Sequence, residues 1–254
     1  MRPWKSWKSK RLWAILALTV IGGGFFAYRV WFLLIAVEVV PDEAIEVDDS
    51  VRHYRLVIPH RLPQERIPIV FAFHGIGNTT EEMAAYSALD RLAAERGFIL
   101  VYPVASNGMW ATMNFDRENL NHNSDVRFFD RLLGHLGERF HLDPNRIYVV
   151  GMSNGASFAQ LLAFTRAEVA AVVAHSGMRP AELTRAVRPF PILLVVGADD
   201  AGVNGVRSDA AQYRDDGHAV ELIVVPGLGH QWSTRHNAAM WDFLSRHARD
   251  RPKN

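Results

Sequence analysis

The chain of 254 residues contains no cysteine. This absence excludes a disulfide framework, a cysteine nucleophile and a lipid anchor attached to cysteine. Beyond the first eleven residues, no basic patch is interleaved with aromatic residues, which argues against nucleic acid as a partner. Five of the 28 Lys and Arg residues lie in that short tail, so 23 remain against 27 Asp and Glu, a formal charge of −4. The length suits one domain with a sizeable core.

An apolar run follows the basic tail of residues 1–11. It carries no charge from residue 12 to 28 and continues beyond Arg29 to residue 37. A helix over residues 12–37 is long enough to cross a bilayer, which takes about 20 mostly apolar residues. The basic tail predicts a cytoplasmic amino terminus, so the rest of the chain is expected in the periplasm, anchored by this single helix. The alternative is a signal sequence that is cleaved to release a secreted protein.

The remainder reads as a linker and one globular domain. Residues 38–50 are acidic and short of large apolar residues, which predicts a solvated linker before a domain at 51–254. Helical patterns alternate with strand patterns from there on, and Asp125 is expected to cap one of the helices. This alternation predicts an α/β fold with a mostly parallel central sheet flanked by helices. The strand patterns cover residues 52–59, 67–73, 98–102, 147–150, 170–174, 191–196 and 219–225.

One strand pattern ends in the sequence Gly-Met-Ser-Asn-Gly, with Ser153 at its centre. A serine on a sharp turn between a strand and a helix leaves little room on either side, and Gly151 and Gly155 supply that room. The backbone N–H of Asn154 would then point toward an oxyanion formed beside the serine. The pattern alone is also compatible with an ordinary turn in which Ser153 caps the next helix.

An acid and a histidine follow at the ends of later strand patterns. Asp200 follows the strand at 191–196, and His230 follows the strand at 219–225. The order Ser, Asp, His is that of a nucleophile, an acid that orients the imidazole, and a base. Asp199 is the alternative acid, although a Gly-x-x-Asp turn favours Asp200. Singly, each residue has a structural interpretation, as a helix cap or a surface histidine.

Aromatic residues near these strand ends are candidates for binding substrate. The stretch at 103–124 is long for a connection inside a compact domain, and such loops are usually functional. Trp110 on this stretch and Trp232 beside His230 are expected to wall a shallow cleft, with burial in the core as an equally open alternative.

Several stretches together resemble the esterase and polyhydroxybutyrate-depolymerase branch of the α/β-hydrolases, which includes feruloyl and acetylxylan esterases. They are HGIGN, ERGFILVYP, SDVRFF, LDPNRIYVVGMSNGA, VGADD and GLGHQW. The resemblance implies an α/β-hydrolase fold, with Ser153 as nucleophile, Asp200 as acid and His230 as base. It also implies an oxyanion hole built from the backbone N–H groups of Asn154 and of Gly75 or Ile76. The chain departs from the family at Ala156, where many members have glycine, and we expect no appended polymer-binding module.

These observations predict a serine hydrolase that cleaves carboxylic esters through an acyl-enzyme on Ser153, with no cofactor, metal or protein partner implied. No insertion is large enough for a helical lid, so we expect small soluble esters: short-acyl, feruloyl or acetyl-sugar esters, or hydroxyalkanoate oligomers. A serine peptidase or amidase on the same residues is one alternative. The other is a membrane-tethered binding module that has kept the fold and lost turnover.

Overall fold

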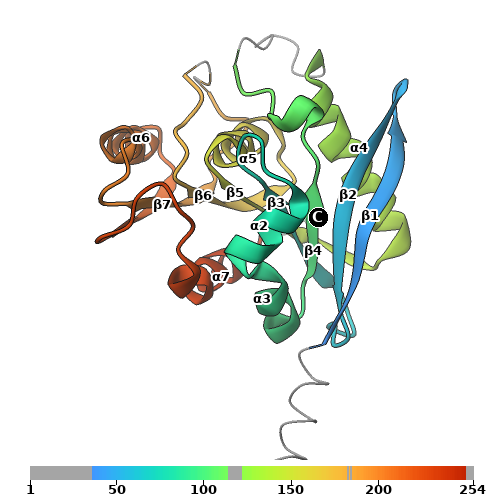
Figure 1. Ribbon diagram of the computed structural model, residues 1–254. Coiled ribbons are helices and arrows are strands. Elements are labelled where there is room, and N and C mark those ends of the chain that lie inside the picture. The colour runs from blue at the N-terminus through green and yellow to red at the C-terminus, as the bar shows by residue number, and fades with distance from the viewer. Residues whose placement is uncertain (1–35, 114–121, 182, 184, 250–254) are drawn as a thin grey trace, which may run out of the picture.

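The computed structural model of the chain describes residues 36–113, 122–181, 183 and 185–249. Eight strands form one sheet in the order β1-β2-β4-β3-β5-β6-β7-β8 (Figure 1). β2 pairs antiparallel with β1 and with β4, while the remaining neighbours are parallel, so the predicted mostly parallel sheet is confirmed. The strands are β1 (Val37–Val47), β2 (Ser50–Pro59), β3 (Ile67–Phe73), β4 (Ile99–Pro103), β5 (Leu142–Met152), β6 (Val169–His175), β7 (Pro191–Gly197) and β8 (Ala219–Val225).

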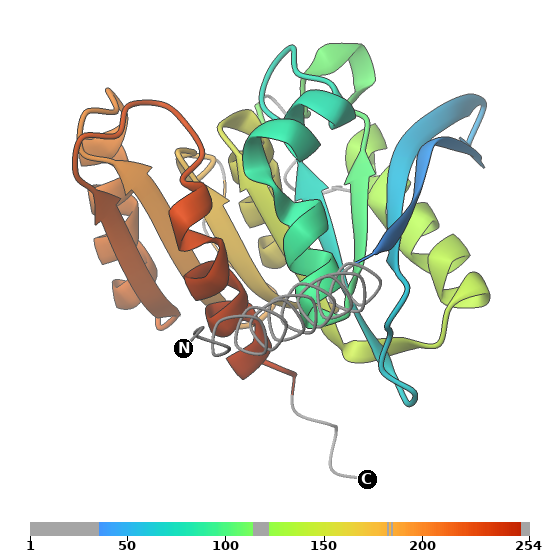
Figure 2. The ribbon, with the colours of Figure 1, turned by 60° about the horizontal axis from the view of Figure 1, so that its bottom comes forward.

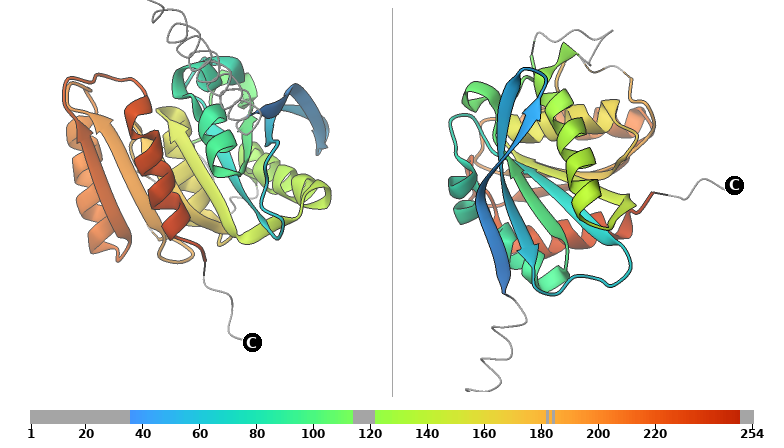
Figure 3. Two further views of the ribbon diagram at one scale, coloured as in Figure 1. Left: turned by 90° about the horizontal axis from the view of Figure 1, so that it is seen from below. Right: turned by 90° about the vertical axis from the view of Figure 1, so that its right-hand side faces the viewer.

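Helices cover both faces of this sheet (Figures 2 and 3). The period of two along a buried strand divides its side chains between the two layers. In β3, Phe71 and Phe73 join the core beneath α4 and α5, whereas Val70 and Ala72 join the core beneath α3 and α7. The helices are α2 (Thr80–Ser87), α3 (Leu89–Arg96), α4 (Ser124–Arg139), α5 (Asn154–Thr165), α6 (Val203–Asp215) and α7 (Asn237–Arg246), with short 3-10 turns η1 (Ser106–Gly108) and η3 (Thr234–His236).

The predicted linker at residues 38–50 is wrong, because most of it is strand β1. β1 pairs with β2 from Val37 opposite Pro59 to Val47 opposite Ser50. Its apolar side chains at Ile45 and Val47 are buried, while the acidic ones stay near solvent, as suits an edge strand. The register shifts between Val40 and Glu43, next to Pro41, which has no N–H to give to a ladder. The domain therefore begins at β1 and not at residue 51.

The predicted membrane anchor at residues 12–37 lies outside the described residues except at its end, where Val37 opens β1. Among the helices that the structure describes, none has both the length and the apolar character to cross a membrane.

The segment after residue 79 forms two helices, α2 and α3, separated at Ala88, whose backbone is left-handed with φ 53°. The predicted helix cap at Asp125 needs correction. Asn123 and not Asp125 caps α4, since the Asn123 side chain accepts from the N–H groups of Asp125 and Val126. The Asp125 carboxylate instead binds Arg52 of β2 at 2.7 Å.

Candidate active site

Ser153 stands between the end of β5 and the start of α5, on a turn with φ 56° and ψ −122°. This conformation is rare for a residue with a side chain. The residues two before and two after it must be glycines, because a Cβ atom on Gly151 would lie 2.2 Å from the carbonyl oxygen of Gly155. A Cβ atom on Gly155 would lie 2.1 Å from the carbonyl oxygen of Phe73 in β3. The turn therefore holds the serine at the carboxyl edge of the sheet.

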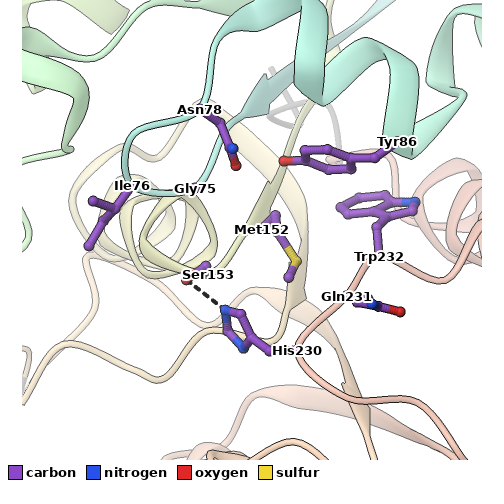
Figure 4. A pocket seen from close by; sticks show the side chains of 9 residues that line it. All are labelled: Gly75, Ile76, Asn78, Tyr86, Met152, Ser153, His230, Gln231 and Trp232. Atoms are coloured by element: carbon purple, nitrogen blue, oxygen red, sulfur yellow. Dashed lines mark hydrogen bonds between the residues drawn. The ribbon is translucent and has the colours of Figure 1, made fainter.

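The structure brings Ser153, His230 and Asp200 into one hydrogen-bonded chain. His230 Nε2 lies 3.0 Å from Ser153 Oγ (Figure 4), and His230 Nδ1 lies 2.9 Å from Asp200 Oδ2. The three residues come from loops after β5, β8 and β7, which end at the same edge of the sheet. Asp199 is exposed and its backbone N–H donates to Leu228 O, so Asp200 is the acid that faces the histidine.

The Asp200 carboxyl is buried and held in its charged form. Burial raises its pKa, but hydrogen bonds outweigh that effect and hold the pKa below its ordinary value. The Gly202 N–H donates to Oδ1 at 2.8 Å, the His230 ring lies 2.9 Å from Oδ2, and the nearby Ser176 side chain also acts to lower this pKa. In contrast, 52% of the His230 side chain is exposed. A buried carboxylate and a half-exposed imidazole suit an acid that orients a base facing solvent.

The loop after β3 faces Ser153 from the other side. Gly75 and Ile76 of this loop line a cavity of about 490 Å³ together with Ser153 and His230 (Figure 4). Asn154 is the first residue of α5, so its backbone N–H is one of the donors left free at a helix start. The sequence-predicted oxyanion residues are therefore all placed next to the nucleophile.

Trp232 lines the cavity, as the sequence predicted, but Trp110 does not. The Trp110 side chain is buried in the core, where it stacks on Phe158 at a centroid distance of 4.8 Å. Its Nε1–H donates to the His74 carbonyl at 3.0 Å, and its backbone N–H donates to Asn154 Oδ1 at 2.7 Å. Trp110 therefore joins the loop after β3 to the start of α5. The prediction that it forms a wall of the cleft is wrong, and the alternative of burial in the core is correct.

Tyr86 is a cavity residue that the sequence did not single out, since its place in α2 fits an ordinary apolar face. Burial raises the pKa of its hydroxyl to about 12, against a smaller opposing effect of the Gly75 backbone. The phenol is therefore neutral at physiological pH and lies beside the loop after β3. Asn78, Met152 and Gln231 complete the lining (Figure 4).

A second cavity of about 630 Å³ shares Ile76, Ser153 and His230 with the first. Its mouth carries the exposed side chains of Met113 and Met178. The nucleophile thus lies where two open cavities meet, an arrangement that accommodates the two halves of a cleavable substrate.

Two further histidines near the site are buried and serve as hydrogen-bond partners. His74 Nε2 accepts from the Ala105 N–H at 3.1 Å, and burial lowers its pKa. His175 Nε2 accepts from the Ser233 N–H at 3.0 Å, and burial lowers its pKa to about 4. Neither of them contacts the Ser153 hydroxyl, in contrast to His230.

Comparison with known proteins places these features in a family. Residues 52–229 match the family described as Esterase PHB depolymerase. A bifunctional acetylxylan esterase/xylanase of Neocallimastix patriciarum is 22% identical over 221 residues, which cover 73% of this chain and 32% of that protein. Feruloyl esterase B of Neurospora crassa is 30% identical over 128 residues, which cover 48% of this chain and 43% of that protein. The chain thus spans less than half the length of these relatives.

A solved structure of fluorophosphonate-binding serine hydrolase F from Staphylococcus aureus superposes with a TM-score of 0.66 at 13% identity. The match covers 82% of this chain and 98% of that one. At this identity the likeness shows the fold alone, which is the α/β-hydrolase fold.

Proposed function

The chain belongs to the Esterase PHB depolymerase family, and from this premise we propose that it hydrolyses carboxylic esters through an acyl-enzyme on Ser153. The single observation that carries the proposal is the hydrogen-bonded chain from Ser153 Oγ through the His230 ring to Asp200. A serine hydroxyl is a weak nucleophile at neutral pH, and an adjacent base oriented by a carboxylate activates it.

In the first half of the reaction, His230 Nε2 takes the proton of Ser153 Oγ as the oxygen attacks the ester carbonyl carbon. Asp200 holds His230 through Nδ1 and stabilises the imidazolium that forms. The carbonyl oxygen becomes an oxyanion, for which the N–H of Asn154 and an N–H of Gly75 or Ile76 are the donors. His230 then gives its proton to the departing alkoxide, so the alcohol leaves and Ser153 carries the acyl group.

In the second half, His230 removes a proton from water that attacks the acyl carbon. The tetrahedral intermediate uses the same oxyanion donors, and its collapse releases the carboxylic acid. The proton held by His230 returns to Ser153 Oγ. This step needs water beside the imidazole, and the half-exposed His230 side chain provides access for it.

We propose small, soluble substrates: short-acyl, feruloyl or acetyl-sugar esters, or hydroxyalkanoate oligomers. The two cavities of about 490 and 630 Å³ are open to solvent around His230, which favours compact groups over long acyl chains. Each methylene that stays in water forgoes about 0.8 kcal/mol of binding. The names of the similar acetylxylan and feruloyl esterases support this range of substrates.

We also propose that the protein is anchored in a membrane by its apolar amino-terminal run, with the catalytic domain in the periplasm. The support is the sequence: a basic tail at 1–11 followed by the uncharged run from residue 12. Since β1 begins at Val37, the anchor would end by residue 36 and not at 37. Cleavage of this segment, releasing a secreted enzyme, is the competing outcome.

A panel of p-nitrophenyl esters from acetate to dodecanoate tests the activity, together with feruloyl, acetyl-sugar and hydroxybutyrate esters and matched anilides. We expect the highest kcat/KM for acetate to butyrate and slow or no turnover of anilides. A kcat/KM that rises to dodecanoate would contradict the open-cleft proposal, and faster anilide turnover would indicate an amidase. A binding module without turnover would hydrolyse none of them.

A further inference from the structure

The last residue of β6, His175, and the residue after it, Ser176, lie against the triad of Ser153, Asp200 and His230, although the reaction described above does not use them. The His175 carbonyl accepts from the Ser153 N–H at 2.9 Å. The Ser176 hydroxyl lies beside the Asp200 carboxyl, and both residues line the second cavity. The His175 ring stacks on Trp232 with a centroid distance of 5.0 Å and accepts from Ser233, in the loop that carries His230.

Ser176 is held in a backbone conformation that its side chain disfavours. Its φ is 53°, in the left-handed region, where glycine is at ease and other residues are strained. The residue is buried, and its N–H donates to Val195 O in β7 at 2.8 Å. Backbone strain of this kind persists where the surrounding structure requires it. A serine at a position that suits glycine therefore indicates that the serine side chain has a role there.

The hydrogen bonds around His175 fix the direction in which the Ser176 hydroxyl donates. His175 Nε2 accepts from the Ser233 N–H, so in the neutral ring the proton is on Nδ1. Nδ1 lies 3.2 Å from Ser176 Oγ, which therefore accepts this proton's hydrogen bond. The single hydrogen of the Ser176 hydroxyl is then free to point at the Asp200 carboxylate, which is an acceptor only. The lowered pKa of His175, about 4, keeps the ring neutral near pH 7.

We propose that Ser176 is a positioning residue for the triad, whose hydroxyl, oriented by His175, donates to the Asp200 carboxylate and keeps it facing His230. Asp200 then has donors from three elements: Gly202 at Oδ1, His230 at Oδ2 and Ser176. A carboxylate held from three directions does not rotate away from the imidazole. Loss of the Ser176 donor frees this rotation, and small displacements of catalytic groups are costly in rate. This inference rests on the proposed catalytic role of the triad.

The test compares Ser176→Ala and Ser176→Gly, using the rate at which a fluorophosphonate labels Ser153. Both variants remove the hydroxyl, but glycine also relieves the strain at φ 53°. Ala88→Gly is the matched control, because Ala88 has the same φ of 53° and lies at the junction of α2 and α3. It measures what relief of strain alone does to the melting temperature, and its labelling rate should stay that of the wild type.

For both Ser176 variants we expect labelling and kcat, each per folded molecule, to fall on the order of 10- to 100-fold with KM little changed. The melting temperature of Ser176→Gly should stay near that of the wild type. Wild-type labelling rates per folded molecule in both variants would overturn the positioning role, whatever their stability. If the wild type is labelled but cleaves no ester, the ester proposal fails while the labelling rates still test Ser176. A wild type that resists labelling would overturn the triad, and with it this inference.

Discussion

The side-chain amide of Asn154 makes two hydrogen bonds with the backbone of Trp110. Asn154 Oδ1 accepts from the Trp110 N–H at 2.7 Å, and Asn154 Nδ2 donates to the Trp110 carbonyl at 3.2 Å. The same Nδ2 donates to Thr112 Oγ1 at 2.9 Å. Since Trp110 in turn holds the His74 carbonyl, one side chain at the start of α5 fixes the loop that carries Gly75 and Ile76. Asn154 thus links the start of α5 to the loop whose backbone N–H groups we propose as oxyanion donors.

Asn154→Ala should therefore lower kcat by about 10-fold or more, even though the backbone N–H at this position is retained. It leaves the Trp110 N–H without its acceptor, which costs about 1–3 kcal/mol of stability when the group stays buried. Thr112→Val removes only one bond of the same cluster and should have a smaller effect on both quantities. Steady-state kinetics and thermal unfolding of the two variants measure the difference. Equal losses of kcat and stability in the two variants would contradict the role of the hydrogen bonds between Asn154 and Trp110.

Asp200→Asn should lower kcat by about 10⁴-fold, because an amide neither fixes the His230 tautomer nor stabilises the imidazolium. Asp199→Asn is the matched control, since the neighbouring carboxylate is exposed and makes no contact with His230 among the described residues. It should keep activity close to that of the wild type. The assignment of the acid is wrong if Asp199→Asn is the more damaging change in kcat/KM.

The buried His175 makes stability depend on pH in a defined window. Its pKa is lowered by burial from 6.5 to about 4, so the unfolded chain takes up the proton first as the pH falls. The contribution of His175 to the free energy of unfolding is fully present above pH 6.5 and is lost progressively between pH 6.5 and 4. Below pH 4 it no longer changes with pH. The loss is about 3 kcal/mol for this group.

Urea unfolding at pH 7, 5.5 and 4.5 measures this loss. His175→Gln should unfold with a smaller difference between pH 7 and 4.5 than the wild type, whatever its absolute stability. Burial also lowers the pKa of His74, which acts in the same direction and remains in both proteins. An unchanged difference in the variant would show that His175 is not the group responsible.

A chain that starts at residue 36 should fold and be active without the apolar run, whereas a chain that starts at Val51 should not. The second truncation removes β1, which uncovers the edge of β2 and takes away the Glu43 carboxylate that binds Tyr54 and Arg139. Soluble yield and melting temperature of the two truncated proteins measure this. The full chain should stay with membranes through carbonate extraction, and a mature amino terminus between residues 27 and 42 would instead show cleavage.

The succession of strands and helices along the chain from β2 onward and the positions of the three triad residues follow from local patterns in the sequence. Gly151 and Gly155 flank a residue that needs space, and each strand ends where its apolar run ends, so Ser153, Asp200 and His230 could be placed by counting. The resemblance to a family then indicated which of these residues is the nucleophile, which the acid and which the base. The strand β1 was missed because its acidic side chains resemble those of a linker when its partner β2 is not in view.

Other features depend on contacts between distant parts of the chain. Asp125 looks like a helix cap, yet its carboxylate binds Arg52 and the Ala111 N–H. Trp110 looks like a cleft residue, yet its indole reaches the carbonyl of His74. Neither partner is indicated by spacing or periodicity, because both pairs form only once β2, β3 and the loop after β4 are packed. The same holds for Ser176, whose place beside Asp200 is set by the pairing of β6 with β7.

The acyl-enzyme itself is the most direct test of the account. Brief incubation with p-nitrophenyl butyrate, acid quench and mass spectrometry of the digested protein should find a butyryl group on the peptide that contains Ser153. A burst of nitrophenol equal to the number of active sites should accompany it if hydrolysis of the acyl-enzyme is the slower step, and Ser153→Ala should show neither signal. Ester turnover that persists in Ser153→Ala, or an acyl group found on another residue in place of Ser153, would contradict it.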